Sequence, residues 1–504
     1  MSDAVGSELV SKVVGYKIAK GNFQNKTSNL PQRIVILGEA NVANQGSLDL
    51  NPKEILSAQQ AGLLYGFGSP IHMAMRILKP VSSTGVGGIP IIVIPQAEVG
   101  GAVQKVMSIT PTGVATGNGT HFVKIAGRNG VDGVFYAINI LEGDTTDDIT
   151  AKIEDAVNNV LGSPFIGTST DYEAILTSKW AGLTSQELNV SMNTNNTDLG
   201  ITYVVNEETA GSGTPSIASS LAMFASEWNT LVVNTYGAEE TIMSTLETFN
   251  GRPDTENPTG QYAAIVMRPF FALTGSTLDD PTTITDGRKD DVTIVICPAP
   301  LSASHSLEAA ANYCVIEARC AQDTPHLDIS GQYLPDMPLP EAGDIPAMSS
   351  YDVRDSYVKK GCSTVEISSG KYKVCDFVTT YHPVGETPPQ FRYVRSLVQD
   401  FNIRFKYFLL EQINVVDHLI ANDNDNVSAS KVVKPKTWKA ILFGLADDLV
   451  DSGLIVDAKF MKDSITVEIS DVNPERLNTF FRYKRSGFAR ISSTVGEAGF
   501  NFGN

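Results

Sequence analysis

The residues best suited to chemistry in this 504-residue chain are its six histidines and five cysteines. The histidines stand singly at His72, His121, His305, His326, His382 and His418. No H-E-x-x-H motif occurs, no C-x-x-C occurs, and no Cys/His spacing fits a zinc site. His326 or His382 could still belong to a site assembled in space. The pattern predicts no metal site and no catalytic histidine.

The sequence also lacks the short motifs that bind nucleotides or activate a nucleophile. No G-x-x-x-x-G-K-[ST] and no G-x-S-x-G is present, and Gly66-Phe67-Gly68 follows a predicted helix where the dinucleotide motif follows a strand. Asp423 begins a stretch similar to an EF-hand loop, but the sixth position is not glycine and Lys434 replaces the required glutamate. We therefore expect no cofactor, no metal and no enzymatic activity.

The cysteines are Cys297, Cys314, Cys320, Cys362 and Cys375. Cys362 and Cys375 flank a predicted hairpin that turns at residues 368–370. Five reduced thiols are the simpler interpretation. The odd count leaves disulfides between subunits open, with Cys362 and Cys375 as the candidates.

Composition indicates a globular protein of two to four domains, with 42% hydrophobic and 19% charged residues. The net charge is -18, and the charged residues are unevenly distributed. From Asp352 onward there are 20 basic and 19 acidic residues, whereas the residues before it include 18 basic and 37 acidic ones. This balance argues against a nucleic-acid-binding surface in the first two thirds. Met1 is not followed by a basic or apolar leader, and the longest apolar runs, 89–94 and 292–297, are too short to span a bilayer. We expect a soluble protein made in a cytosol.

Alternating strand and helix patterns predict an α/β fold with a largely parallel sheet. Strands are expected at residues 32–38, 88–94, 228–234, 262–267 and 292–297. Helices are expected from Pro52 to Leu64 and at residues 70–78, 239–249 and 306–321. Between residues 102 and 205, short alternating runs with one helix around Ile149 and Ile153 predict an inserted β-rich domain.

A long amphipathic helix is expected at residues 391–420, and a second one begins at Pro435 and ends at Gly453. Four cations lie off the apolar stripe of the first helix: Arg392, Arg395, Arg404 and Lys406. They form either an ordinary solvated face or a basic surface that contacts a partner.

Both ends of the chain carry strand patterns without a partner nearby in the sequence. At the start, Val14, Tyr16 and Ile18 alternate with smaller or polar residues between polar flanks. At the end, Ile465 and Val467 begin one alternating run and Phe481 and Tyr483 another, and Phe488, Arg490 and Ile491 follow Gly487. Unpaired strands favour pairing with other chains, so we expect both ends to exchange strands between copies. The alternative is an ordinary edge strand within one domain.

Several stretches resemble the contractile tail sheath proteins of myophages, in particular the Mu-like branch. The similar stretches are QRIVILGEA at 32–40 with Gly46, SAQQA at 57–61 with LYGFGSP at 64–70, GDT at 143–145, GCST at 361–364, and VTTY at 378–381 before the long helix. The similarity extends over nearly the whole chain. The cysteines are not part of the family pattern.

The resemblance implies a sheath subunit in stacked six-membered rings around a tail tube, which contracts without nucleotide. It implies an N-terminal arm (1–29), an α/β core (30–100 and 215–350), the inserted domain (101–214), an inner domain facing the tube (351–486) and a C-terminal arm (487–504). Partners would be neighbouring sheath subunits, the tail tube protein, and baseplate and neck or tail terminator proteins. No direct nucleic-acid contact and no membrane insertion are expected. The location would be the virion tail, after assembly in the host cytoplasm.

Three alternatives remain at this point. The first is the sheath of a pyocin-like particle or other contractile injection system. The second is an α/β enzyme with a β-rich specificity domain, although no set of residues in the sequence supports it. The third is another virion protein, such as a tail tube or baseplate component.

Overall fold

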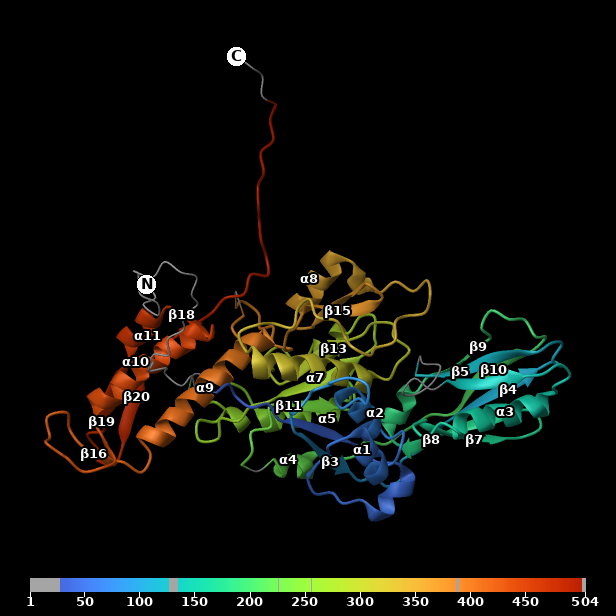
Figure 1. Cartoon of the computed structure of the whole chain (residues 1–504), viewed down its shortest axis with the longest axis horizontal. Helices are drawn as coiled ribbons and strands as arrows, with labels where there is room; N and C mark the ends of the chain where they lie inside the picture. Colours follow the sequence, from blue (N-terminus) through green and yellow to red (C-terminus); the bar gives the residue numbers. More distant parts are fainter. Residues whose placement is uncertain (1–27, 127–134, 225, 255, 387–388, 501–504) are drawn as a thin grey trace, which may run out of the picture. The chain divides into compact units, whose positions relative to one another are not determined.

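The computed structural model describes residues 28–126, 135–224, 226–254, 256–386 and 389–500 (Figure 1). These residues form two compact units. The larger unit contains residues 29–405 and the described residues from Lys484 onward, and the smaller contains residues 406–483 with Ser28. The predicted exchange residues Val14, Tyr16 and Ile18 lie outside the described residues. The six segment boundaries expected from the sequence stay a prediction.

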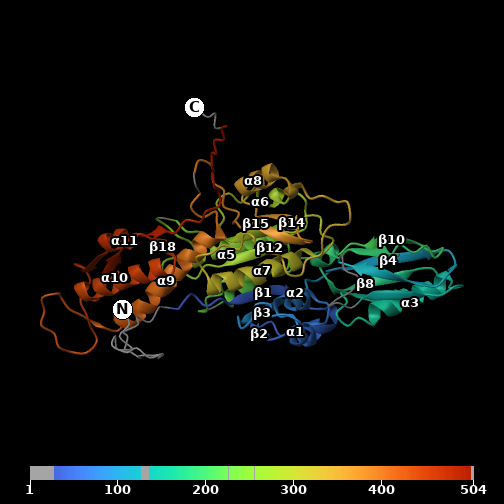
Figure 2. The ribbon, with the colours of Figure 1, turned by 45° about the horizontal axis from the view of Figure 1, so that its top comes forward.

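A six-stranded sheet forms the centre of the larger unit (Figure 2), in the order β13-β12-β11-β1-β3-β2. Its strands are β1 (Ile34–Glu39), β2 (Lys53–Glu54), β3 (Ile91–Gln96), β11 (Leu231–Asn234), β12 (Phe271–Ser276) and β13 (Ile294–Pro298). All neighbours pair in parallel except β2, which is antiparallel to β3. Every residue of β1, β3, β11, β12 and β13 is buried, which explains their continuous apolar runs. The expected α/β fold is confirmed.

Helices α2 (Pro70–Leu78) and α7 (Ser306–Asp323) pack against each other, α2 over β1 and α7 over β11, β12 and β13. Helix α5 (Glu240–Asn250) contacts β13, and α4 (Ala218–Ala222) contacts β3. The remaining helices of this unit are α1 (Ala58–Tyr65), α6 (Thr282–Thr285) and α8 (Tyr351–Lys359). The prediction for α2 is confirmed at both ends, since Ser69 caps it and Pro70 is its first residue.

Two predicted elements of the core are wrong. The helix expected from Pro52 begins only at Ala58, because Ser57 accepts a hydrogen bond from the Gln60 N–H, and residues 53–54 form the edge strand β2. The strand expected at residues 262–267 is a turn in which Ile265 is 97% exposed. The strand is β12, whose first N–H donates to the Thr230 carbonyl and continues the parallel ladder. Two apolar runs compete here, and only the second is in register with β11.

The β-rich insertion consists of two antiparallel sheets, in the orders β10-β4-β8-β7 and β6-β5-β9. Its strands are β4 (Gln104–Thr112), β5 (Gly119–Ile125), β6 (Tyr136–Ile140), β7 (Phe165–Ser169), β8 (Ala174–Ala181), β9 (Val190–Asn193) and β10 (Thr202–Thr209). Helix α3 (Thr146–Asn158) buries Ile149 and Ile153 against them. The turn after β8 reaches the core, where the Thr184 hydroxyl donates to Glu39 Oε2 at the end of β1 (3.1 Å).

Helix α9 (Val394–Asn414) crosses from one unit to the other and is shorter at both ends than predicted. Beyond it, Asp417 has a φ of 60°, and β16 (Leu419–Ile420) pairs with β17 (Val432–Val433). In the larger unit β14 (Thr364–Ser368) and β15 (Lys371–Asp376) form the predicted hairpin around Gly370. No helix in the described ranges is long and apolar enough to cross a membrane.

The smaller unit is built on α10 (Pro435–Asp451), which confirms the predicted second helix. Gly453, with a φ of 71°, ends it by donating to the Val450 carbonyl (2.9 Å). After β18 (Ile455–Val456) and α11 (Ala458–Ser464), β19 (Thr466–Ile469) and β20 (Leu477–Phe480) form an antiparallel hairpin that packs on α10. Buried Trp438 donates to the Thr479 hydroxyl (3.1 Å). The short strand β21 (Lys484–Arg485) follows.

Candidate functional site at the root of the C-terminal arm

Residues 485–490, here called the arm root, are fastened to the larger unit by side chains. From Ser486 to Phe500 the chain forms no helix or strand, and every residue from Ile491 to Phe500 is exposed. Arg485 begins the fastening with a two-pronged ion pair to Asp400 on α9, in which Nε lies 2.8 Å from Oδ1. Its guanidinium also lies over the Phe391 ring, 5.6 Å from the centroid.

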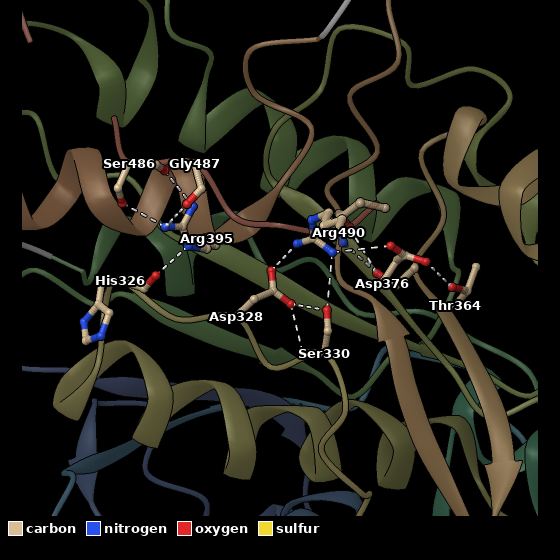
Figure 3. Close-up of polar contacts among 11 residues, drawn as sticks. His326, Asp328, Ser330, Thr364, Asp376, Arg395, Ser486, Gly487 and Arg490 are labelled. Carbon is tan, nitrogen blue, oxygen red and sulfur yellow. Dashed lines mark hydrogen bonds and ion pairs between the residues drawn. The ribbon is translucent and has the colours of Figure 1, made fainter. Parts of the chain in front are cut away.

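Arg395 on α9 holds the next two residues of the arm root (Figure 3). It is only 7% exposed, and its Nε donates to the His326 carbonyl (2.6 Å). Its Nη1 donates to the Ser486 carbonyl (3.0 Å) and its Nη2 to the Ser486 hydroxyl (2.9 Å), which also accepts from Gln399 (2.6 Å). Burial lowers the pKa of Arg395 from its ordinary value. These bonds satisfy a buried guanidinium with the backbone of the arm itself.

Arg490 closes the arm root (Figure 3). Its Nη2 forms an ion pair with Asp328, and its Nη1 lies 3.3 Å from both Asp376 Oδ1 and the Ser330 hydroxyl. The guanidinium sits over the Tyr393 ring, 4.1 Å from its centroid. Asp328 follows α7 in the chain, Asp376 ends β15 and Tyr393 precedes α9, so three parts of the larger unit converge on one side chain.

Burial makes the Arg490 pair stronger than a surface pair. The Asp328 side chain is 1% exposed, and its Oδ1 already accepts from the Ser330 N–H (2.8 Å). Removing the partner of such a carboxylate typically costs about 3–5 kcal/mol, whereas an exposed pair such as Lys459–Asp463 contributes about 0–1 kcal/mol. The arm root is therefore held firmly to the larger unit.

The structure corrects the expectation of a basic face on α9. Arg395 is turned into the arm root, and Lys406 is 1% exposed and pairs with Asp448 of the smaller unit (3.2 Å). Neither presents charge at the surface, so the prediction is wrong for these two. Arg392 and Arg404 are half-buried, and their contact with a partner stays a prediction.

The predicted exchange residues divide into two groups. Arg490 binds its own chain, and Phe488 is 40% exposed beside it, with Arg395 over its ring. Ile491 is 87% exposed, and its exchange with another copy stays a prediction. Ile465 is fully buried ahead of β19, while Val467 within β19 is half-buried.

The strand expected at residues 481–484 is wrong, because β20 ends at Phe480. Phe481 and Tyr483 are half-buried, and Phe481 packs against Tyr407 with ring centroids 5.5 Å apart. Among the residues that the structure describes, β19 and β20 form a two-stranded sheet in which each strand pairs only with the other.

None of the five cysteines forms a disulfide within the described chain. Cys362 is fully buried, and burial raises the pKa of its thiol. Cys375 is half-buried and burial raises its pKa to about 11, so neither thiol favours the reactive thiolate. A disulfide between subunits stays a prediction, and Cys375 is the more accessible of the two.

The other candidates for chemistry serve structural roles. His326 supplies a backbone carbonyl to Arg395, and His382 Nδ1 lies 2.6 Å from the Thr380 carbonyl. Asp423 accepts from the Lys436 N–H at the start of α10 (2.9 Å). No cluster of three or more metal-ligating side chains occurs in the described part of the chain.

Sequence reasoning placed Arg490 in the exchanged strand and missed its role in the arm root. One signal was available: Arg490 is the only basic residue after Arg485, in a tail otherwise made of small, apolar and acidic residues. Its partners, Asp328 and Asp376, lie 162 and 114 residues earlier in the sequence, and no local pattern connects them.

Comparison with known proteins shows a relative across most of the chain. The chain is 22% identical over 428 residues to the Mu-like prophage FluMu tail sheath protein of Haemophilus influenzae, and the match covers 83% of each protein. No family model matches. The resemblance to Mu-like tail sheath proteins is thereby confirmed.

Two solved structures are also similar to the chain. The sheath tail protein of Desulfitobacterium hafniense is 10% identical, with a TM-score of 0.42, over 93% of this chain and 100% of that chain. The contracted helical sheath of the anti-feeding prophage is 10% identical, with a TM-score of 0.43, over 98% and 100%. Both TM-scores are below 0.5, so the functional inference depends on the sequence similarity.

Proposed function

We propose that this protein is the structural subunit of a contractile phage tail sheath. The observation that carries the proposal is the similarity to the Haemophilus tail sheath protein over 83% of both chains. A match over 83% of both proteins covers more than one motif or one domain. The features of the larger unit agree with a structural role, because the polar groups at the arm root bind one another and hold a chain end.

In this proposal the subunits form stacked six-membered rings around a tail tube, in the virion, after assembly in the host cytoplasm. Contraction moves the subunits as rigid bodies, without nucleotide, and drives the tube through the host envelope for genome delivery. The tube, the baseplate and the neck or tail terminator proteins are the partners. Residues 351–486 face the tube, with Arg392 and Arg404 as contact residues.

Neighbouring subunits are joined by strand exchange at the smaller unit. No third strand pairs with the hairpin β19–β20 in the described part of the chain, and an extended segment of another copy adds to its edge through main-chain hydrogen bonds. Val467 and Ile469 are half-buried on the hairpin while Thr466 and Glu468 are exposed, so an added strand extends a sheet with one apolar face. The N-terminal arm around Tyr16 and the C-terminal arm beyond Arg490 supply the strands.

Negative-stain electron microscopy of the purified full-length protein tests the proposal. We expect tubes of regular diameter to appear as the protein is concentrated, since a sheath subunit carries its own lattice contacts. Particles that remain monomeric at high concentration, with or without purified tail tubes, would contradict it.

A further inference from the structure

We propose that Arg490 anchors the C-terminal arm: it holds the arm root on its own subunit when a second copy binds the residues beyond it. This inference rests on the proposed function. In this proposal, the buried ion pair between Arg490 and Asp328 transmits force from the exchanged strand to the larger unit.

The first argument is that buried side chains attach the arm root to the larger unit. Residues 486–490 belong to no helix or strand. They are held by Arg395 at Ser486 and by Arg490 at Asp328 and Asp376. Both side chains are mostly buried, so solvent does not screen these contacts as it screens surface pairs.

The second argument is the position of Arg490 along the chain. It is the last residue before a stretch in which every residue to Phe500 is exposed. A pull on that stretch reaches Arg490 before it reaches Ser486 or Arg485. Withdrawing Arg490 would expose Asp328, Asp376 and the face of Tyr393 together, because one guanidinium contacts all three. Several contacts that must break at once resist force better than contacts that break singly.

The anchoring of Arg490 also determines which side chains the second copy contacts. With Arg490 held, the exchanged segment starts at Ile491. In an extended strand Ile491, Ser493 and Val495 point to one face, and Ser492, Thr494 and Gly496 to the other. The two exposed apolar side chains therefore lie on the same face, opposite a face of small residues. This spacing fits a strand added to the β19–β20 hairpin, whose own apolar residues share one face.

The test compares full-length wild type with Arg490→Gln, using Arg252→Gln as the matched control. Arg252 forms an exposed pair with Asp290 (4.0 Å) in the same unit. Limited chymotrypsin digestion of the soluble protein reports on the Arg490 anchor without requiring assembly, because Phe488 lies within the arm root and a protease cleaves a mobile segment faster than one that is held. We expect cleavage at the Phe488–Ala489 bond to be at least tenfold faster in Arg490→Gln, with cleavage elsewhere in the larger unit unchanged, and no change in the control. An unchanged rate of cleavage at this bond would overturn the proposal.

Two further measurements keep the test decisive. If Arg490→Gln fails to fold, the double variant Asp328→Asn/Arg490→Gln removes the unpaired buried carboxylate, and it should restore folding while the Phe488–Ala489 bond is still cleaved faster than in wild type. In assembled tubes, we expect Arg490→Gln to dissociate at a lower urea concentration than the control. Tubes equally resistant in both variants would contradict a role for Arg490 in transmitting force. Failure of wild type to form tubes would instead contradict the proposed function, and the digestion experiment would still decide whether Arg490 holds the arm root.

Discussion

At the residue scale, burial gives several ionisable side chains a structural role. Glu39 at the end of β1 is the clearest case outside the arm root. It is 1% exposed, and desolvation raises its pKa from about 4.5 to about 8, although the hydrogen bond from Thr184 opposes the shift. The carboxyl group is therefore protonated at neutral pH, in the place where the turn of the insertion meets the core.

This shift predicts a pH dependence of stability. Between pH 4.5 and about 8 the folded state retains a proton that the unfolded state releases, so the free energy of unfolding decreases as pH rises, by about 3–5 kcal/mol in total. Glu39→Gln should lose this part of the pH dependence and be more stable than wild type at pH 9. Urea denaturation at pH 5 and pH 9 measures it, with exposed Glu54→Gln as the control. Equal pH slopes for wild type and Glu39→Gln would contradict it.

Residue types alone did not reveal which cations are buried. Arg395 and Arg404 both lie off the apolar stripe of α9, yet Arg395 is interior and Arg404 half-buried. The difference arises because Ser486, 91 residues later, returns to cover Arg395. Helical periodicity describes a helix and its nearest face, and it contains no information about a distant segment that packs on the polar side.

At the element scale, the sequence predicted well wherever a local signal fixes a boundary. Ser69-Pro70 starts α2, Pro435 starts α10, and Gly453 ends α10, each through a cap or a restricted backbone. The failures lie where two local options compete. Pro52 could start a helix, but Ser57 provides a side-chain cap, and the apolar run at residues 262–267 loses to Phe271–Ser276 because only the latter is in register with β11.

Helix α9 carries the prediction for the tube contact. With Arg395 and Lys406 buried, Arg392 and Arg404 are the remaining candidates for contact with an acidic partner. Arg392→Glu and Arg404→Glu should reduce co-assembly with tail tubes at least several-fold while the soluble subunit stays folded. Co-sedimentation with purified tubes measures this, and Arg252→Glu provides the control. Co-assembly at the wild-type level in both variants would exclude these arginines from the tube surface.

At the scale of the whole molecule, the α/β class and the β-rich insertion could be predicted, and the fastening of the arm could not. Strand and helix periodicities are local, whereas the arm root depends on residues separated by up to 162 positions. The strand pattern around Ile465 and Val467 anticipated β19, but its partner β20 lies at Leu477–Phe480 and not at the expected residues 481–484, and the packing of α10 against β19 was not predicted.

Truncation separates folding from assembly. Removing residues 491–504 leaves Arg490 in place, so we expect a folded subunit with an unchanged thermal midpoint that forms no tubes. Removing Met1–Gly21 should have the same result if the N-terminal arm also supplies a strand. Circular dichroism and electron microscopy together measure both properties. Normal tubes from either truncated protein would show that the corresponding arm is dispensable.

A helical reconstruction of tubes assembled from the wild-type protein tests strand exchange between copies most directly. We expect the segment from Ile491 onward to lie as an added strand on the β19–β20 hairpin of another subunit, with Arg490 still bound to Asp328 of its own. A lattice in which each arm folds back onto its own subunit, and every β19–β20 hairpin keeps bare edges, would contradict it.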